Sequence, residues 1–142
     1  MRRIDLRGLV RLMPDAAYLI DSFAWFEYFI GSGAGMKAKP NIEAGNAITP
    51  TIVIAELADK YAREKMSFSE KLNFILVRTQ DVSLDVPIAQ QSGMLNKERK
   101  RAVKRWGLAD SIVMATARAR NAKIITGDEH FRDLADDAIM IK

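Results

Sequence analysis

The sequence predicts an α/β fold of three layers, in which helices cover both faces of a mainly parallel central sheet. Short apolar runs of strand length alternate along the chain with longer segments of helical periodicity, as parallel sheets require. The 142 residues, 49% of them apolar and 28% charged, suit one globular domain with its own core. We expect this domain over residues 16–142, preceded by an N-terminal extension over residues 1–15.

The alternation begins with a strand, a helix and a loop. AAYLI, residues 16–20, is an apolar run of strand length, and SFAWFEYFI at 22–30 has apolar side chains at helical spacing. Gly, Pro and Asn crowd together in residues 31–46, which predicts a loop.

Two helices should follow this loop. Thr49 offers an N-cap with Pro50 at the first helical position, so a helix is expected from there to about residue 65. SFSE at 67–70 has the pattern of a capping box and predicts a helix over about 68–78.

The second half of the chain continues the alternation, again with proline and asparagine at helix boundaries. The expected elements are a strand over 81–86, a helix starting at Pro87, a helix over 108–121, a strand over 123–126, a short helix from Asp128 and a strand over 138–141.

The composition excludes several kinds of site. The chain has no cysteine, so disulfides, thiolate zinc sites and cysteine nucleophiles are impossible. The single histidine, His130, excludes a two-histidine nuclease and a His-rich metal cluster; we expect it to be an exposed residue of the short helix. No apolar run is long enough for a membrane span, and charges interrupt the N-terminal stretch too often for a secretory signal. We therefore expect a cytoplasmic protein with no membrane association.

Four acids stand at positions that suggest chemistry. Asp21 and Asp128 follow apolar strands, and ligands of parallel sheets bind at the carboxyl ends of strands. Asp110 lies in the first turn of its helix, while Glu56 lies in mid-helix on the apolar face with Ile52. Helix capping would also explain each aspartate. An ion pair with Lys or Arg, or a twist of the helix toward water, would explain Glu56.

The convergence of these four acids in one crevice would favour bound cations. Carboxylates held close together repel, and protonation or cations must relieve the repulsion. Without cysteine and with one histidine, the ligands would be almost entirely oxygen atoms, which favours Mg²⁺ or Mn²⁺. Such ions lower the pKa of bound water and neutralise charge on a phosphodiester.

A basic segment suggests an anionic partner. The net charge is +4, and NKERKRAVKR at 96–105 holds six basic residues against Glu98 alone. A solvated helix face is one interpretation, and a strip that binds the phosphates of a nucleic acid is the other. The residues of this basic strip are Lys97, Arg99, Lys100, Arg101, Lys104 and Arg105.

Three segments together resemble the PIN domain, and within it the VapC-type toxin ribonucleases. They are LIDSFAWFEYF at 19–29, TIVIAELADKY at 51–61 and GLADSIVMATARARNAKIITGDEHF at 107–131. The resemblance covers about residues 16–142, and the last segment is its most specific part. Residues 1–15 depart from the family pattern and would be an extra helix, a swapped arm or a misassigned start.

The resemblance implies a function and its residues. Asp21, Glu56, Asp110 and Asp128 match the family's metal-binding and catalytic acids, and Ser22 and Thr126 match the hydroxyl positions that support them. It implies an endoribonuclease that hydrolyses RNA by a metal-activated water. A homodimer and an antitoxin protein as partner are also implied, with RNA as the substrate.

Other functions stay open from the sequence. A PIN-domain RNA-processing nuclease would use the same residues as a toxin. A catalytically inactive RNA-binding or scaffold module would keep the basic strip. A phosphoacceptor signalling domain fits poorly, because Ile20 rather than a second acid precedes Asp21.

Overall fold

The computed structural model describes residues 15–142, so the expected extension over residues 1–15 lies outside the described residues except for Asp15. Five strands form one sheet in the order β3-β2-β1-β4-β5, with every neighbouring pair parallel. This confirms the expected α/β fold with a parallel sheet. The strands are β1 (Tyr18–Ile20), β2 (Ala47–Pro50), β3 (Gln80–Val82), β4 (Lys123–Thr126) and β5 (Ala138–Met140).

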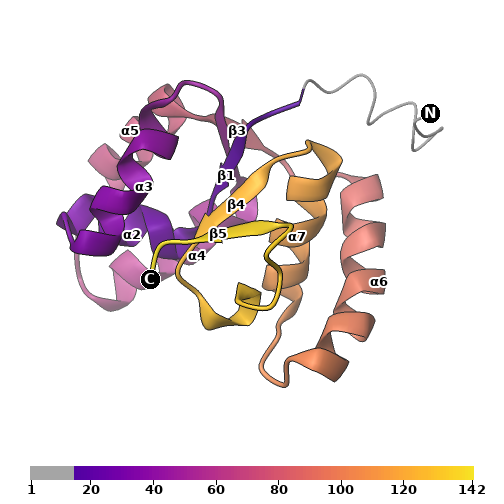
Figure 1. Cartoon of the computed structure of the whole chain (residues 1–142). Helices are drawn as coiled ribbons and strands as arrows, with labels where there is room; N and C mark the ends of the chain where they lie inside the picture. The colour runs from indigo at the N-terminus through magenta and orange to yellow at the C-terminus, as the bar shows by residue number, and fades with distance from the viewer. Residues whose placement is uncertain (1–14) are drawn as a thin grey trace.

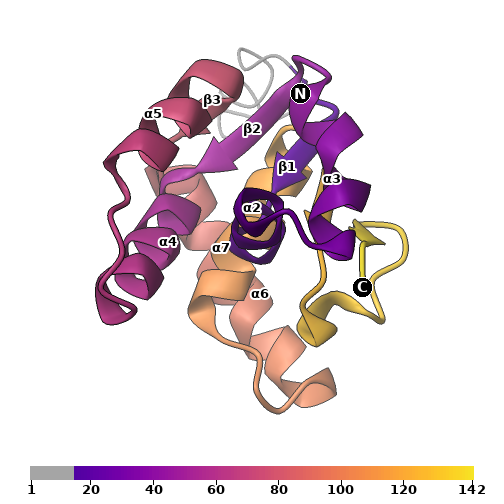
Figure 2. The ribbon, with the colours of Figure 1, turned by 90° about the vertical axis from the view of Figure 1, so that its left-hand side faces the viewer.

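Helices lie on both sides of the sheet. Helices α2, α3 and α5 lie on one side and α6 and α7 on the other, while α4 contacts both α2 and α7 (Figures 1 and 2). No helix in the described part of the chain is both long and apolar enough to cross a membrane. The helices are α2 (Ser22–Ile30), α3 (Gly33–Glu43), α4 (Thr51–Arg63), α5 (Ser69–Arg78), α6 (Val86–Ala102), α7 (Leu108–Ala119) and the 3₁₀ helix η1 (Glu129–Phe131).

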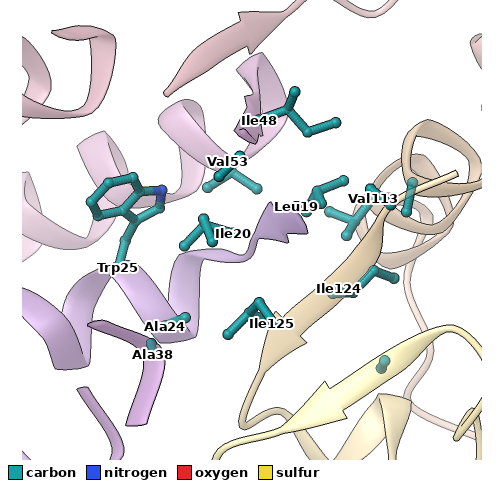
Figure 3. Packing of buried hydrophobic residues seen from close by; sticks show 14 of the residues in the cluster. Leu19, Ile20, Ala24, Trp25, Ala38, Ile48, Val53, Val113, Ile124 and Ile125 are labelled. Atoms are coloured by element: carbon teal, nitrogen blue, oxygen red, sulfur yellow. The ribbon is translucent and has the colours of Figure 1, made fainter. Parts of the chain in front are cut away.

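The core forms around the two central strands. Leu19 and Ile20 of β1 and Ile124 and Ile125 of β4 are fully buried, and side chains from the helices on both sides surround them (Figure 3). Trp25 is also fully buried and donates its indole N–H to Thr49 Oγ1 at 3.1 Å. Close packing of this kind fixes the ends of β1 and β4 relative to each other, and these ends carry the candidate site.

The predicted loop over residues 31–46 is wrong, because most of it is helix α3. Ser32 caps this helix by accepting a hydrogen bond from the Gly35 backbone N–H at 3.0 Å. Gly35 is present for packing: a Cβ there would collide with the backbone of Glu27 in α2. Glycine therefore allows two helices to approach closely here, instead of marking a loop.

Two predicted helix starts are also corrected. Thr49 and Pro50 belong to the buried strand β2, and α4 begins one residue later, because β2 pairs with both β1 and β3. The capping box at 67–70 is absent: α5 begins at Ser69, and Phe68 at its N-cap makes no side-chain hydrogen bond. Strand β3 covers only part of the predicted strand over 81–86, because Asp85 caps α6.

Candidate functional site

The structure brings the four predicted acids to the carboxyl end of the two central strands. Asp21 directly follows β1, and Asp128 lies two residues after β4. Glu56 comes from the middle of α4 and Asp110 from the first turn of α7. Helices α2, α4 and α7 meet at this end of β1 (Figure 2). The charges of Asp110 and Asp128 reach both of the other acids and raise the pKa of each.

Asp21 is the most buried of the four acids. Its side chain is nearly inaccessible, with the residue 5% exposed, although it stands at the N-cap of α2 without a side-chain capping bond. Burial raises its pKa to about 6, against the lowering effect of hydrogen bonds from Thr126 and the Ser22 backbone. The Thr126 hydroxyl donates to Asp21 Oδ2 at 2.7 Å. Helix capping therefore does not explain this aspartate.

Glu56 is half-buried and faces the other acids. Burial raises its pKa to about 7, the charge of Asp21 adds to the rise, and a hydrogen bond with the Ser22 side chain opposes it. Among residues 15–142 no lysine or arginine forms an ion pair with Glu56. The ion-pair explanation of Glu56 thus fails for the part of the chain that the structure describes.

Asp110 and Asp128, in contrast, have local donors. The Gly107 backbone N–H donates to Asp110 Oδ2 at 3.0 Å, and the His130 backbone N–H donates to Asp128 Oδ1 at 2.9 Å. The Thr126 hydroxyl also accepts from the Asp128 backbone N–H at 3.0 Å, so one hydroxyl links two of the acids. These two aspartates therefore serve as helix caps and still face the site.

His130 is not the exposed residue that the sequence suggested. Its side chain is 26% exposed, and its Nδ1 lies 2.8 Å from Asp110 Oδ2 and 3.8 Å from Asp128 Oδ1. One ligand atom from each of these three residues lies within 4.8 Å of the others, a spacing that could hold a cation. No sequence signal identified this contact, because it joins positions 20 residues apart through the packing of η1 against α7.

A cleft of about 380 Å³ opens beside the acids. Ser22, Glu56 and Asp128 line it together with two cationic side chains from α4, Lys60 and Arg63. No sequence pattern distinguished these cations, although they follow Glu56 by one and two helical turns. Each cation is paired with an acid one helical turn away, Lys60 with Glu64 at 3.2 Å and Arg63 with Asp59 at 2.9 Å. The cleft therefore presents acids together with cations whose charge is locally balanced.

The basic strip divides into two parts. Lys97, Arg101, Lys104 and Arg105 are exposed, and Lys100 is exposed but donates to the Trp106 carbonyl at 2.7 Å. Arg99 is buried and binds both carboxylate oxygens of Asp133 at 2.9 Å. Arg99 is thus an internal residue that joins α6 to the segment after η1, and we remove it from the proposed phosphate-binding surface.

The donor set fits a hard divalent cation. Electrostatic interactions connect the four carboxylates, two of which have raised pKa values, and ligand atoms of Asp110, Asp128 and His130 lie within 4.8 Å of one another. Within residues 15–142 the ion pairs of the four acids involve His130 alone. Oxygen-rich sites with unrelieved negative charge favour Mg²⁺ or Mn²⁺. Asp21, Glu56, Asp110 and Asp128 are the residues that could hold such an ion.

The sequence matches one protein family, the PIN domain, over residues 18–137. No curated protein matches the chain.

Several solved structures share the fold over nearly their whole length. A toxin–antitoxin complex from Klebsiella pneumoniae has a chain that is 19% identical, with a TM-score of 0.70 and coverage of 89% of this chain and 98% of that one. A chain of DNA-bound VapBC from Salmonella typhimurium is 17% identical with a TM-score of 0.67, and the match covers 89% of this chain and 99% of that one. A chain of VapBC-1 from nontypeable Haemophilus influenzae is 20% identical with a TM-score of 0.61, and the match covers 88% of this chain and 98% of that one. At these identities the likeness establishes a shared fold.

Proposed function

The chain belongs to the PIN domain family, and we propose from this premise that it is a metal-dependent endoribonuclease. The observation that carries the proposal is the meeting of Asp21, Glu56, Asp110 and Asp128 from four separate segments at one edge of the sheet. Within the described residues these acids lack a lysine or arginine partner, although burial, with the charges of the other acids adding to it, raises the pKa of Asp21 and of Glu56. Such an arrangement costs stability unless a cation binds.

We propose Mg²⁺ or Mn²⁺ as the cofactor. When bound, the ion would supply the lowered pKa of a water molecule and the charge neutralisation that hydrolysis of a phosphodiester needs. The four acids would hold it, and the Ser22 and Thr126 side chains, which hydrogen-bond Glu56 and Asp21, would keep those two carboxylates oriented. The raised pKa values imply that the acids bind metal more tightly as the pH rises through about 6 to 7.

RNA is proposed as the substrate because cationic side chains lie on two sides of the acids, exposed ones before α7 and ones paired with neighbouring acids on α4. Lys60 and Arg63 line the cleft itself. Lys104 and Arg105 are exposed in the segment between α6 and α7, three and two residues before Gly107, which contacts Asp110. Cations placed in this way would hold the phosphates on either side of the one that reaches the acids.

Cleavage of single-stranded RNA tests this proposal. The purified protein should cut RNA with Mg²⁺ or Mn²⁺ and should lose all activity in excess EDTA. Asp21→Asn should abolish cleavage, whereas Asp81→Asn, which changes an exposed acid of β3, should leave the rate unchanged. Equal cleavage in EDTA would refute the metal-dependent mechanism, and a metal-binding protein without activity would favour the scaffold alternative.

The salt dependence of RNA binding tests the strip. Lys104→Glu should weaken binding and lower the slope of log affinity against log salt by about 1. Lys37→Glu, a matched reversal of an exposed lysine in α3, should change the slope less, because α3 is not part of the strip or the cleft. Equal slopes for the two variants would favour the interpretation of the strip as a solvated helix face.

We further propose that the protein is the toxin of a toxin–antitoxin pair, acting as a homodimer and inhibited by an antitoxin protein. The support is the fold, since the similar structures from Klebsiella pneumoniae and Salmonella typhimurium are toxin–antitoxin complexes. Induced expression should arrest growth, and Asp110→Asn should remove the arrest. Growth at the normal rate with an active nuclease would favour the alternative role in RNA processing.

A further inference from the structure

His130 contacts two of the four acids at once, through different atoms. Its backbone N–H donates to Asp128 Oδ1 at 2.9 Å, and its ring Nδ1 lies 2.8 Å from Asp110 Oδ2. The contact is a hydrogen bond from the ring to the carboxylate when Nδ1 is the nitrogen that bears the hydrogen. A single residue thus sets the distance between an acid of α7 and an acid that follows β4.

The contact with Asp110 leaves one carboxylate oxygen for a ligand. Oδ2 of Asp110 receives two donors, the Gly107 backbone N–H at 3.0 Å and the His130 ring at 2.8 Å. No hydrogen bond to Oδ1 of Asp110 is found among residues 15–142. The carboxylate is therefore held from one side, with its other oxygen available to the site.

The imidazole is itself held by buried neighbours. The Trp106 ring lies 6.5 Å from the His130 ring, and the guanidinium of Arg99 stacks 4.4 Å above the same tryptophan. Arg99 also donates to the His130 carbonyl oxygen at 3.1 Å while it binds Asp133. Arg99, itself buried and paired with the more exposed Asp133, thus holds the backbone from which His130 reaches the acids.

We propose that His130 is a positioning residue of the metal site: it donates from Nδ1 to Asp110 and from its backbone to Asp128, and it does not ligate the ion. The inference rests on the proposed function, because it assumes that these acids bind a divalent cation. Outer hydrogen bonds of this kind orient ligands, and their loss typically weakens metal binding about 10–100-fold. The alternative is direct ligation, which the spacing of 4.8 Å or less among the three residues would also permit.

Nitrogen NMR of the only imidazole separates these two roles. Because His130 is the single histidine, its ring nitrogens give an unambiguous signal in the ¹⁵N-labelled full chain. Nδ1 should be protonated in the apoprotein and should stay protonated when Mg²⁺ is added. Loss of the Nδ1 proton or a large shift of the Nε2 signal on addition of Mg²⁺ would show direct ligation, and an unprotonated Nδ1 in the apoprotein would show that the ring does not donate to Asp110; any of these results would overturn the proposal.

Two matched variants test the effect on binding. The side-chain amide of Asn reaches the position of Nδ1, whereas that of Gln reaches the position of Nε2. His130→Asn should keep the Mn²⁺ affinity, measured by paramagnetic titration, within about threefold of wild type, whereas His130→Gln should lose about 10–100-fold. Thermal unfolding of both apoproteins would show that each variant is folded.

Failure of the inference and failure of the proposed function give different results. If the wild type binds Mn²⁺ and both variants bind it equally well, His130 has no positioning role, and the nuclease proposal stands. If the wild-type protein does not bind Mn²⁺ or Mg²⁺ at all, the proposed function fails and the positioning role with it.

Discussion

The four acids of the candidate site form two pairs that differ in how the protein supports them. Asp110 and Asp128 receive backbone N–H donors from Gly107 and His130 and cap α7 and η1. Asp21 and Glu56 cap nothing, and burial raises their pKa values to about 6 and about 7. The first pair is thus placed by local structure, whereas the second is forced into the site by the fold at a cost in stability.

This difference separates two requirements of a metal site. The capping pair supplies carboxylates whose geometry is set before an ion arrives, because the same hydrogen bonds also complete the helices. The buried pair supplies unrelieved charge, which a divalent cation would stabilise strongly. A site built only from caps would lack this unrelieved charge, and one built only from buried acids would be partly protonated near neutral pH.

Replacement of one acid from each pair should give the largest effects on cleavage and tests the difference between the pairs most directly. Asp21→Asn and Asp110→Asn should each reduce cleavage by at least about 100-fold, equal to about 2.7 kcal/mol of activation free energy. Their effects on the apoprotein at pH 8 should be opposite in sign. Asp21→Asn should raise the free energy of unfolding because it removes a buried charge. Asp110→Asn should lower it by about 0.5 kcal/mol, because a carboxylate in the first turn stabilises α7.

Chemical denaturation of both variants without metal measures these changes. A loss of stability in both would mean that Asp21 is stabilised locally in the same way as Asp110. The two pairs would then not differ as described.

The free energy of unfolding of the wild-type protein should depend on pH because of the buried pair, Asp21 and Glu56. Both acids have folded pKa values above their ordinary ones, 3.8 for Asp21 and 4.5 for Glu56, so the folded state binds more protons between about pH 4 and pH 7. Their contribution to stability is complete below about pH 4 and is lost as the pH rises through 6 and 7. The apoprotein should therefore melt at a lower temperature at pH 8 than at pH 5.

Added metal should reverse this loss. Mg²⁺ at 100 times its dissociation constant should add about 2.7 kcal/mol at pH 8. The same concentration should add much less at pH 5, where Asp21 and Glu56 are protonated. Melting curves with and without Mg²⁺ at the two pH values measure both effects, with Asp21→Asn as the control that should flatten the dependence. Equal stabilisation by Mg²⁺ at both pH values would place the ion away from the buried pair.

The sequence predicted the fold class because the strands next to the site are apolar and short. β1 and β4 were both recognisable as apolar runs, each followed by an acid, and the end of β1 indicated the position of Asp21. β2 was missed because Thr49 and Pro50 also have the chemistry of a helix start, and only pairing with β1 and β3 decides between the two. α3 was missed because the reason for Gly35 is a contact with another helix.

The four acids of the site could be predicted from the sequence, whereas the residues that hold them in place could not. Glu56 could be identified because a carboxylate on an apolar face needs an explanation, and that signal is local. His130 and Arg99 were misread because the role of each depends on a partner 20 or more residues away, Asp110 in one case and Asp133 in the other. Sequence patterns indicate which residues are unusual, whereas tertiary packing decides what they contact.

The sharpest test of the comparison is the removal of one charge from Glu56. Glu56→Gln keeps the size of the side chain and a hydrogen-bonding group for Ser22 and removes the repulsion from Asp21. The apoprotein at pH 8 should gain about 1 kcal/mol in free energy of unfolding, a modest gain because the side chain is only half-buried.

Glu27→Gln is the matched control, since Glu27 lines the same cleft and lies outside the group of four acids. A loss of several kcal/mol in Glu56→Gln alone would instead show that the carboxylate is part of a structural ion pair. The Glu56 carboxylate would then stabilise the fold by itself, and its charge would no longer require a bound cation.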